Sequence, residues 1–399
     1  MSGMGSLDPR YLCVLRVHRP FFLGGRARPA AIVRKPNEGH GVLAPLGNAF
    51  NSWFGKPEQP CETQTALLSW HWAEDLIAVA TGARLDRICA FSFQNGVWEI
   101  AGQRVPMFQG TRCLAFRPFA GRVLAIGCDD GVVLLRGTKT EHLRAPGHTH
   151  VVSLDWSSDG SKLATASAAD GLVRLWDVGT GKSMVVDRGG LVCFSRGAGG
   201  RFLFVASAVS NFFRLWCTET WTMERWGYLS GPVAAVTWSP DGMALFFSTH
   251  GESAIHVISI GGPRIDDDTK VIHTEHTELP EKGGPGGTPV LLEMDNTGER
   301  LAVAYETPQE ELESGGGLHN EDFRTDPNRR HVVALYATQL QPTFRISPVG
   351  YVSGPEESGP PVGIKFNSRG NANKLTVLSC MWRSGDVTCT QLLFNPYRQ

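Results

Sequence analysis

Short apolar runs separated by polar turns recur along most of the 399-residue chain. The clearest example contains three such runs in succession, Val151–Trp156, Leu163–Ser167 and Leu172–Trp176. Ser158-Asp159-Gly160 and Asp170-Gly171 separate them, and both contain residues that favour tight turns. Runs of this length, bounded by turn residues, are typical of strands rather than helices. The pattern therefore predicts a small antiparallel sheet built from consecutive strands.

The same pattern recurs at seven places, each with an aromatic or large apolar landmark followed by a polar turn and an apolar strand. The first five landmarks follow one another at roughly the 40–45-residue period of a four-stranded repeat unit, and the last two intervals are longer. A four-stranded sheet cannot bury both faces alone, so repetition implies a ring of sheets. We therefore expect an all-β, seven-bladed β-propeller, although six or eight blades fit the pattern too. The landmarks are Trp70, Phe116, Trp156, Phe194, Trp238, Met294 and Phe366.

The segment between Gly147-His148 and Trp176-Asp177 resembles a WD40 repeat. In such repeats a buried hydrogen-bond chain runs from imidazole to indole and fixes the blade, because buried polar groups must be paired. A catalytic role for the histidine and aspartate of this chain is the alternative interpretation, but scaffolding explains both residues. The expected members are His148, Thr165 or Ser167, Asp170 and Trp176.

Composition divides the chain into a basic N-terminal extension, residues 1–62, and a propeller, residues 63–397. Two stretches without apolar periodicity, about 261–289 and 306–330, predict long acidic surface loops inserted in the propeller. Neither loop has the regular carboxylate spacing of a calcium site, and His273 and His276 support a metal site there only weakly. We therefore expect no bound metal.

The N-terminal extension contains a good strand, Tyr11–Val17, which we expect to complete the last blade around Asp386–Phe394, with a strand near Cys61 as the alternative. The rest of the extension is expected to be a partly disordered basic arm, and a targeting signal is an alternative interpretation. Phe50, Trp53 and Phe54 belong to an apolar stripe of near-helical spacing that would contact a partner, a membrane surface or the propeller's own flank.

Features of catalysis and nucleic-acid binding are missing from the sequence. It has no G-x-S-x-G, Walker A, G-x-G-x-x-G or H-E-x-x-H motif, so we expect no enzyme activity, cofactor or small-molecule substrate. A net charge of −1 gives no global attraction for nucleic acid. The nine cysteines include no C-x-x-C pair, which favours reduced thiols.

The stretch from Trp221 to Trp226, W-T-M-E-R-W, followed by Leu229-Ser230-Gly231, resembles the aladin family of WD-repeat nucleoporins. The resemblance covers about residues 65–395 and implies a WD-repeat protein without catalytic activity. The pre-propeller region is shorter here than is usual in that family. The two indoles would pack between blades or form an exposed tryptophan–arginine patch. The candidate partner-binding residues are Trp221, Glu224, Arg225 and Trp226.

This resemblance implies a scaffold of the nuclear pore complex at the nuclear envelope. Its expected partners are an integral membrane nucleoporin and other nuclear pore proteins, with the chain peripheral to the membrane and supporting nucleocytoplasmic transport. A soluble WD40 adaptor of another pathway, such as a ubiquitin-ligase substrate receptor, is the alternative. An enzyme built on a propeller would need titratable residues around the central channel, and a channel lined by apolar and small residues would exclude it.

Overall fold

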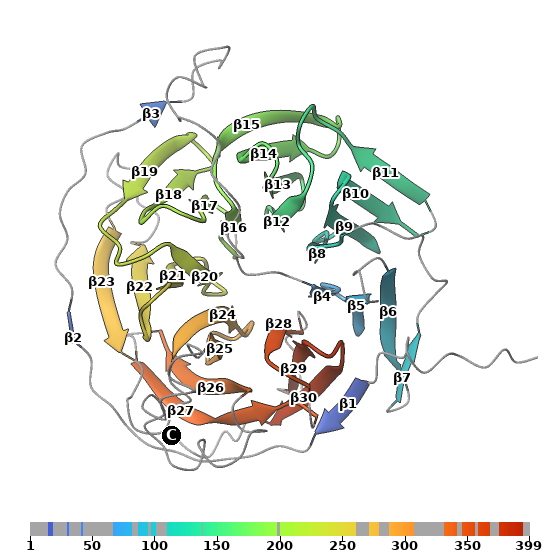
Figure 1. The fold of residues 1–399 in the computed structure, drawn as a ribbon, viewed down its shortest axis with the longest axis vertical. Helices are drawn as coiled ribbons and strands as arrows, with labels where there is room; N and C mark the ends of the chain where they lie inside the picture. The colour runs from blue at the N-terminus through green and yellow to red at the C-terminus, as the bar shows by residue number, and fades with distance from the viewer. Residues whose placement is uncertain are drawn as a thin grey trace, which may run out of the picture.

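The computed structural model describes residues 15–18, 30–31, 41–42, 67–81, 87–94, 97–100, 110–137, 139–197, 200–260, 271–278, 287–306, 331–340, 345–355, 358–367 and 375–393. Within these ranges the chain forms strands and turns and no helix. The strands make seven separate sheets arranged in a ring (Figure 1). The predicted all-β propeller is therefore confirmed.

Six of the seven sheets contain four consecutive antiparallel strands, and we number them by chain order from the first to the sixth sheet. They begin with β4 (Leu68–Trp70), β5 (Leu76–Thr81), β6 (Arg87–Gln94) and β7 (Val97–Ile100), then β8 (Cys113–Phe116), β9 (Val123–Cys128), β10 (Gly131–Arg136) and β11 (Lys139–Leu143), then β12 (Val151–Trp156), β13 (Lys162–Ser167), β14 (Leu172–Asp177) and β15 (Lys182–Arg188). They continue with β16 (Leu191–Phe194), β17 (Phe202–Ala206), β18 (Phe213–Cys217) and β19 (Thr222–Trp226), then β20 (Val233–Trp238), β21 (Ala244–Thr249), β22 (Ala254–Ile260) and β23 (Val271–Glu278), then β24 (Thr288–Met294), β25 (Arg300–Glu306), β26 (Val332–Gln339) and β27 (Arg345–Ser353).

The seventh sheet is composite. It has three consecutive strands, β28 (Pro361–Phe366), β29 (Leu375–Trp382) and β30 (Val387–Leu393), and its fourth strand is β1 (Leu15–His18) from the N-terminal segment. The seven predicted units therefore yield six blades that are continuous in sequence, not seven. β1 pairs in parallel with β30, with Leu15 opposite Val387. A strand of the N-terminal segment therefore joins the last sheet, as the closing-strand hypothesis expected.

The N-terminal segment also adds short strands to two blades that already have four. β2 (Ala30–Ala31) pairs with β23, and β3 (Gly41–Val42) pairs with β19. Figure 1 shows β1, β2 and β3 on the outside of the ring, beside β30, β23 and β19 respectively. Phe50, Trp53 and Phe54 lie outside the described residues.

The seven landmark residues occupy equivalent positions. Each is the last residue of the first strand of its sheet, and these first strands lie nearest the centre of the ring (Figure 1). A strand between two packed sheets is buried on both faces, which explains why β9, β20 and β21 are fully buried and apolar or small throughout. The repeating pattern in the sequence therefore indicates the inner strands of each blade.

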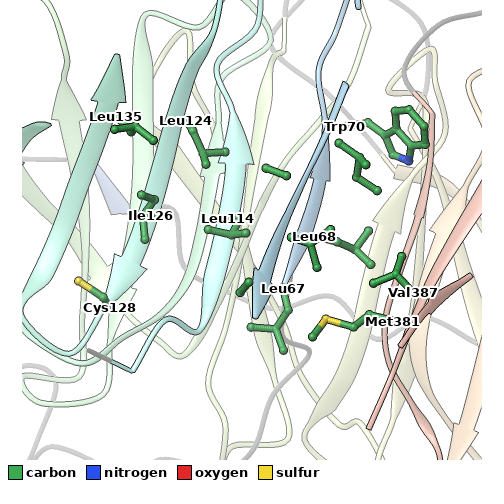
Figure 2. Packing of buried hydrophobic residues seen from close by; sticks show 14 of the residues in the cluster. Leu67, Leu68, Trp70, Leu114, Leu124, Ile126, Cys128, Leu135, Met381 and Val387 are labelled. Carbon is green, nitrogen blue, oxygen red and sulfur yellow. The ribbon is translucent and has the colours of Figure 1, made fainter. Parts of the chain in front are cut away.

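The core is a series of apolar layers between neighbouring sheets, including the layer where the ring closes. Leu67 and Leu68 of the first sheet pack in one cluster with Leu114 of the second sheet and with Met381 and Val387 of the seventh (Figure 2). Leu68 and Val387 are fully buried. The first and last sheets are thus joined by the same kind of packing that joins the others.

One predicted loop is wrong in part. The stretch 261–289 was expected to be an insertion without regular structure, but it contains β23 and the start of β24. β23 is the outermost of the four consecutive strands of its blade, pairs with β22 along its length, and has the two-residue β2 on its other side. An outer strand needs a backbone partner on one side only and tolerates polar side chains, so its sequence VIHTEHTE carries little apolar signal. Most of the other predicted insertion, residues 307–330, lies outside the described residues.

Candidate functional site

The predicted hydrogen-bond chain of the third sheet is present. Asp170 Oδ2 lies 3.1 Å from His148 Nδ1, and His148 Nε2 lies 2.8 Å from Thr165 Oγ1. The indole N–H of Trp176 donates to the same threonine oxygen over 2.8 Å. A carboxylate accepts only, so Nδ1 carries the imidazole hydrogen, and Nε2 accepts from the threonine hydroxyl. Thr165, rather than Ser167, is the hydroxyl of this chain.

The side chains of this hydrogen-bond chain are mostly buried, and its one carboxylate is stabilised by hydrogen bonds. His148, Thr165 and Trp176 are all buried. Burial alone would raise the pKa of Asp170, but hydrogen bonds from His148 and from the Leu172 N–H lower it below its usual value. Each group in this hydrogen-bond chain is paired with another of its members, as buried polar groups require.

The fourth sheet anchors its equivalent tryptophan differently. Trp216 donates its indole N–H over 2.8 Å to Asp187, which lies on β15 of the third sheet. Arg214 Nη1 lies 2.7 Å from the other oxygen of Asp187. This carboxylate is fully buried, and burial raises its pKa despite the charge of Arg214 and the indole bond. The sequence pattern did not reveal Asp187 because its partners belong to the next blade.

The landmark tryptophans also bond across blade boundaries. Trp156 donates to the carbonyl of Ala115 over 3.1 Å. Trp238 donates to the carbonyl of Cys193 over 3.4 Å. Trp70 donates to Ser379 Oγ over 3.2 Å, where the first sheet meets the seventh. In each case the acceptor lies on the preceding blade of the ring.

The candidate tryptophans of the fourth sheet pack between blades. Trp221 contacts the core layer between the third and fourth sheets. Trp226 contacts the next layer and stacks on Phe213, with ring centroids 6.1 Å apart and planes 4° apart. Glu224 is half-buried, and Arg225 is exposed with its guanidinium 4.1 Å from the ring centroid of Phe212. The exposed part of the candidate patch is therefore Arg225 rather than the indoles.

A charged cluster lies around the axis of the ring. Glu293 on β24 is 4% exposed at its side chain, and its two oxygens bind Arg196 Nη2 at 2.9 Å and Lys365 Nζ at 2.6 Å. Arg196 lies in the turn that follows β16 of the fourth sheet, so its ion pair with Glu293 of the sixth sheet bypasses the intervening fifth sheet. Asp155 Oδ2 accepts the Phe194 N–H over 2.7 Å. The axis is thus not lined by apolar and small residues alone.

The pKa shifts show how these groups compensate one another. Burial would raise the pKa of Glu293, but the charges of Lys365 and Arg196 hold it below its usual value. Burial raises the pKa of Asp155, opposed in part by the Phe194 N–H and by Lys365 and Arg196. Two carboxylates and two cations balance one another here. Such pairing favours a structural role for the cluster.

The described residues also bear on metal, membrane and thiol sites. Among these residues no group of three or more His, Cys, Asp or Glu side chains could hold a metal ion. No helix there is long and apolar enough to span a bilayer. The cysteines seen in this part of the chain are free thiols. The sequence pattern did not reveal an exposed pair of rings, Trp72 and Phe119, in turns of the first and second sheets.

The ring of sheets and its indole anchors define a WD-repeat β-propeller. The family model "WD domain, G-beta repeat" matches residues 139–177, which is β11 together with β12–β14. Among solved structures, the chain resembles the β-propeller domain of Myceliophteria thermophila Cps50 (Swd1), with a TM-score of 0.56, 12% identity, and coverage of 83% of this chain and 97% of that one. It also resembles a chain of the Mitotic Checkpoint Complex, with a TM-score of 0.58, 12% identity, and coverage of 92% and 99%.

By sequence, one relative is Aladin of Arabidopsis thaliana. It is 26% identical over 367 residues, which are 83% of this chain and 76% of that protein. The resemblance predicted from the W-T-M-E-R-W stretch is therefore confirmed, and the chain is similar to aladin. The two solved structures share the β-propeller fold with this chain.

Proposed function

We propose that this chain is a non-catalytic scaffold of the nuclear pore complex. The observation that carries the proposal is its similarity to aladin over 83% of its length, combined with a propeller whose buried charges pair internally. A rigid ring offers two faces and a rim to other proteins, which suits a scaffold. On this proposal the chain sits at the nuclear envelope beside the membrane, docks to an integral membrane nucleoporin and supports nucleocytoplasmic transport.

The composite seventh sheet would act as the seventh blade. Its packing against the first sheet and the Trp70–Ser379 hydrogen bond support this assignment. Residues 63–397 would then form the propeller, and residues 1–62 a basic N-terminal extension. Within the predicted partner-binding set, Glu224 and Arg225 are the proposed contacts, because Trp221 and Trp226 are engaged between blades.

Localisation of the tagged full chain in its own cells, combined with proximity labelling, tests the proposal. We expect a punctate nuclear rim and a membrane nucleoporin among the most strongly labelled proteins. A diffuse signal with ubiquitin-ligase subunits labelled would instead support a soluble adaptor and contradict the pore assignment.

A pair of matched variants tests the rim contact. Arg225→Ala should weaken labelling of the membrane nucleoporin without lowering the melting temperature, because the side chain is exposed. Arg136→Ala, which removes an arginine paired with Glu141 at the rim of the second sheet, is the control and should leave labelling unchanged. Equal labelling in both variants would rule out Arg225 as a contact.

A further inference from the structure

Two exposed aromatic rings from neighbouring blades touch on one side of the propeller. Trp72 lies in the turn between β4 and β5, and Phe119 in the turn between β8 and β9. Their ring centroids are 4.9 Å apart and their planes are tilted by 52°. Trp72 is 36% exposed and Phe119 is 70% exposed. We call this pair the Trp72–Phe119 platform.

Hydrogen bonds of the buried His71 side chain connect the two turns that carry the platform. His71 is 2% exposed, and its Nδ1 accepts the N–H groups of Ala73 at 3.3 Å and Glu74 at 3.0 Å. The remaining hydrogen is therefore on Nε2, which donates to the Gly121 carbonyl over 2.9 Å. This bond ties the turn carrying Trp72 to the turn carrying Phe119. Both rings are consequently presented in a fixed relation before any partner arrives.

The backbone conformation of Phe119 also bears on how the platform is presented. Its φ is 53°, in the left-handed region that costs free energy for a residue with a Cβ atom and that glycine adopts freely. Such strain normally persists where packing or function offsets it. At 70% exposure, the phenyl ring gains little from the core. The left-handed conformation therefore places the ring on the surface, in contact with Trp72.

Charges at the border of the platform identify the class of partner. Arg122 binds Glu74 through Nε at 3.0 Å and Nη2 at 2.7 Å, with side chains 61% and 42% exposed. This pair neutralises itself, so the border neither attracts polyanions such as nucleic acid nor favours an anionic bilayer. Two rings in contact offer room for one or two side chains, which suits a short linear segment more than a domain.

We propose that the Trp72–Phe119 platform binds a short extended segment of a partner protein, with an uncharged proline or branched aliphatic residue seated on the two rings. Aromatic surfaces recognise extended proline-containing segments in this way, and rigid aromatic anchors dominate interface affinity. The inference rests on this surface alone and does not depend on the nuclear pore proposal.

Site-specific photo-crosslinking tests the proposal. The full chain carries p-benzoylphenylalanine at position 119 in its own cells, and a matched chain carries it at position 184, where exposed Met184 lies on β15. The captured segment is sequenced, synthesised as a labelled peptide and titrated by fluorescence anisotropy. The proteins titrated are the wild type, Trp72→Ala, Phe119→Gly and Met184→Ala. Vesicles of phosphatidylcholine and phosphatidylserine are titrated in parallel.

The expected result is an adduct specific to position 119, with a proline or aliphatic residue at the crosslink. Trp72→Ala and Phe119→Gly should raise the peptide Kd about tenfold or more, while Met184→Ala leaves it unchanged. Phe119→Gly should keep or raise the melting temperature because it relieves the positive φ. The proposal is overturned by the same adducts at both positions, by a charged residue at the contact, by binding to vesicles, or by a lower melting temperature in Phe119→Gly.

Discussion

The third and fourth sheets place a tryptophan at the same position of their third strand but hold it in different ways. Trp176 is anchored inside its own blade, through Thr165 and His148 to Asp170. Trp216 is anchored by Asp187 of the neighbouring blade. The first arrangement holds the strands of one blade together, and the second holds two neighbouring blades against each other. A propeller needs both, because each sheet is stable only against its neighbours.

The largest expected loss of stability comes from the local anchor. Trp176→Ala removes a fully buried indole and should lower the free energy of unfolding by about 3–5 kcal/mol. Chemical denaturation with intrinsic fluorescence measures this change. Loss of partner binding in this variant should follow the loss of folded protein. Unchanged melting with lost binding would show that the indole acts as a contact instead.

The anchor between blades should be nearly as sensitive. Asp187→Ala leaves the Arg214 guanidinium and the Trp216 indole without their buried acceptor, and should cost about 3 kcal/mol. Asp187→Asn keeps an acceptor oxygen and should cost less. Hydrogen exchange should show both the third and fourth sheets loosened in Asp187→Ala. Loosening confined to the third sheet would contradict a bridging role.

A smaller effect is expected from the hydroxyl in the middle of the local chain. Thr165→Val keeps the volume but leaves Trp176 Nε1 and His148 Nε2 without their partner, which should cost about 1–3 kcal/mol. Coupling to Trp176→Phe in a double-mutant cycle should be large, and coupling to Asp187→Asn small. Equal coupling to both would mean that the two anchors are not separate.

The smallest effect concerns the pH dependence set by the axis of the ring. The pKa of Glu293 is held below its usual 4.5, so the stability it supplies is present above that pH and is lost as pH falls through its folded pKa. Glu293→Gln should therefore flatten the acid side of the stability curve by at most about 1.4 kcal/mol per pH unit. Unfolding midpoints between neutral and acidic pH measure this slope, and identical slopes in both proteins would argue against Glu293 titrating there.

The repeating inner strands were predictable because their signal is local. Each landmark residue marks the end of a first strand, and the chain from His148 to Trp176 follows from spacing within one blade. The resemblance to aladin rested on a short tryptophan-rich stretch, which encodes packing between blades rather than an exposed contact.

Features that depend on a neighbouring blade were not predictable. Asp187 and Glu293 bind side chains of other blades, and one sequence gives no register between blades. β23 was missed because an outer strand needs no apolar alternation. The Trp72–Phe119 platform was missed because an exposed ring in a turn leaves no periodic trace.

The hydrogen bond between Trp70 and Ser379 joins residues 309 positions apart in the chain. Ribosomes add about 5–20 residues per second, so the first of these residues leaves the ribosome about 15–60 s before the second. During that interval the apolar face of the first sheet, including Leu68, has no seventh sheet to cover it. Each newly made molecule therefore spends most of its synthesis as an incomplete ring with an exposed apolar surface on the first sheet. Its yield in cells will depend on how well chaperones cover that surface until the seventh sheet closes the ring.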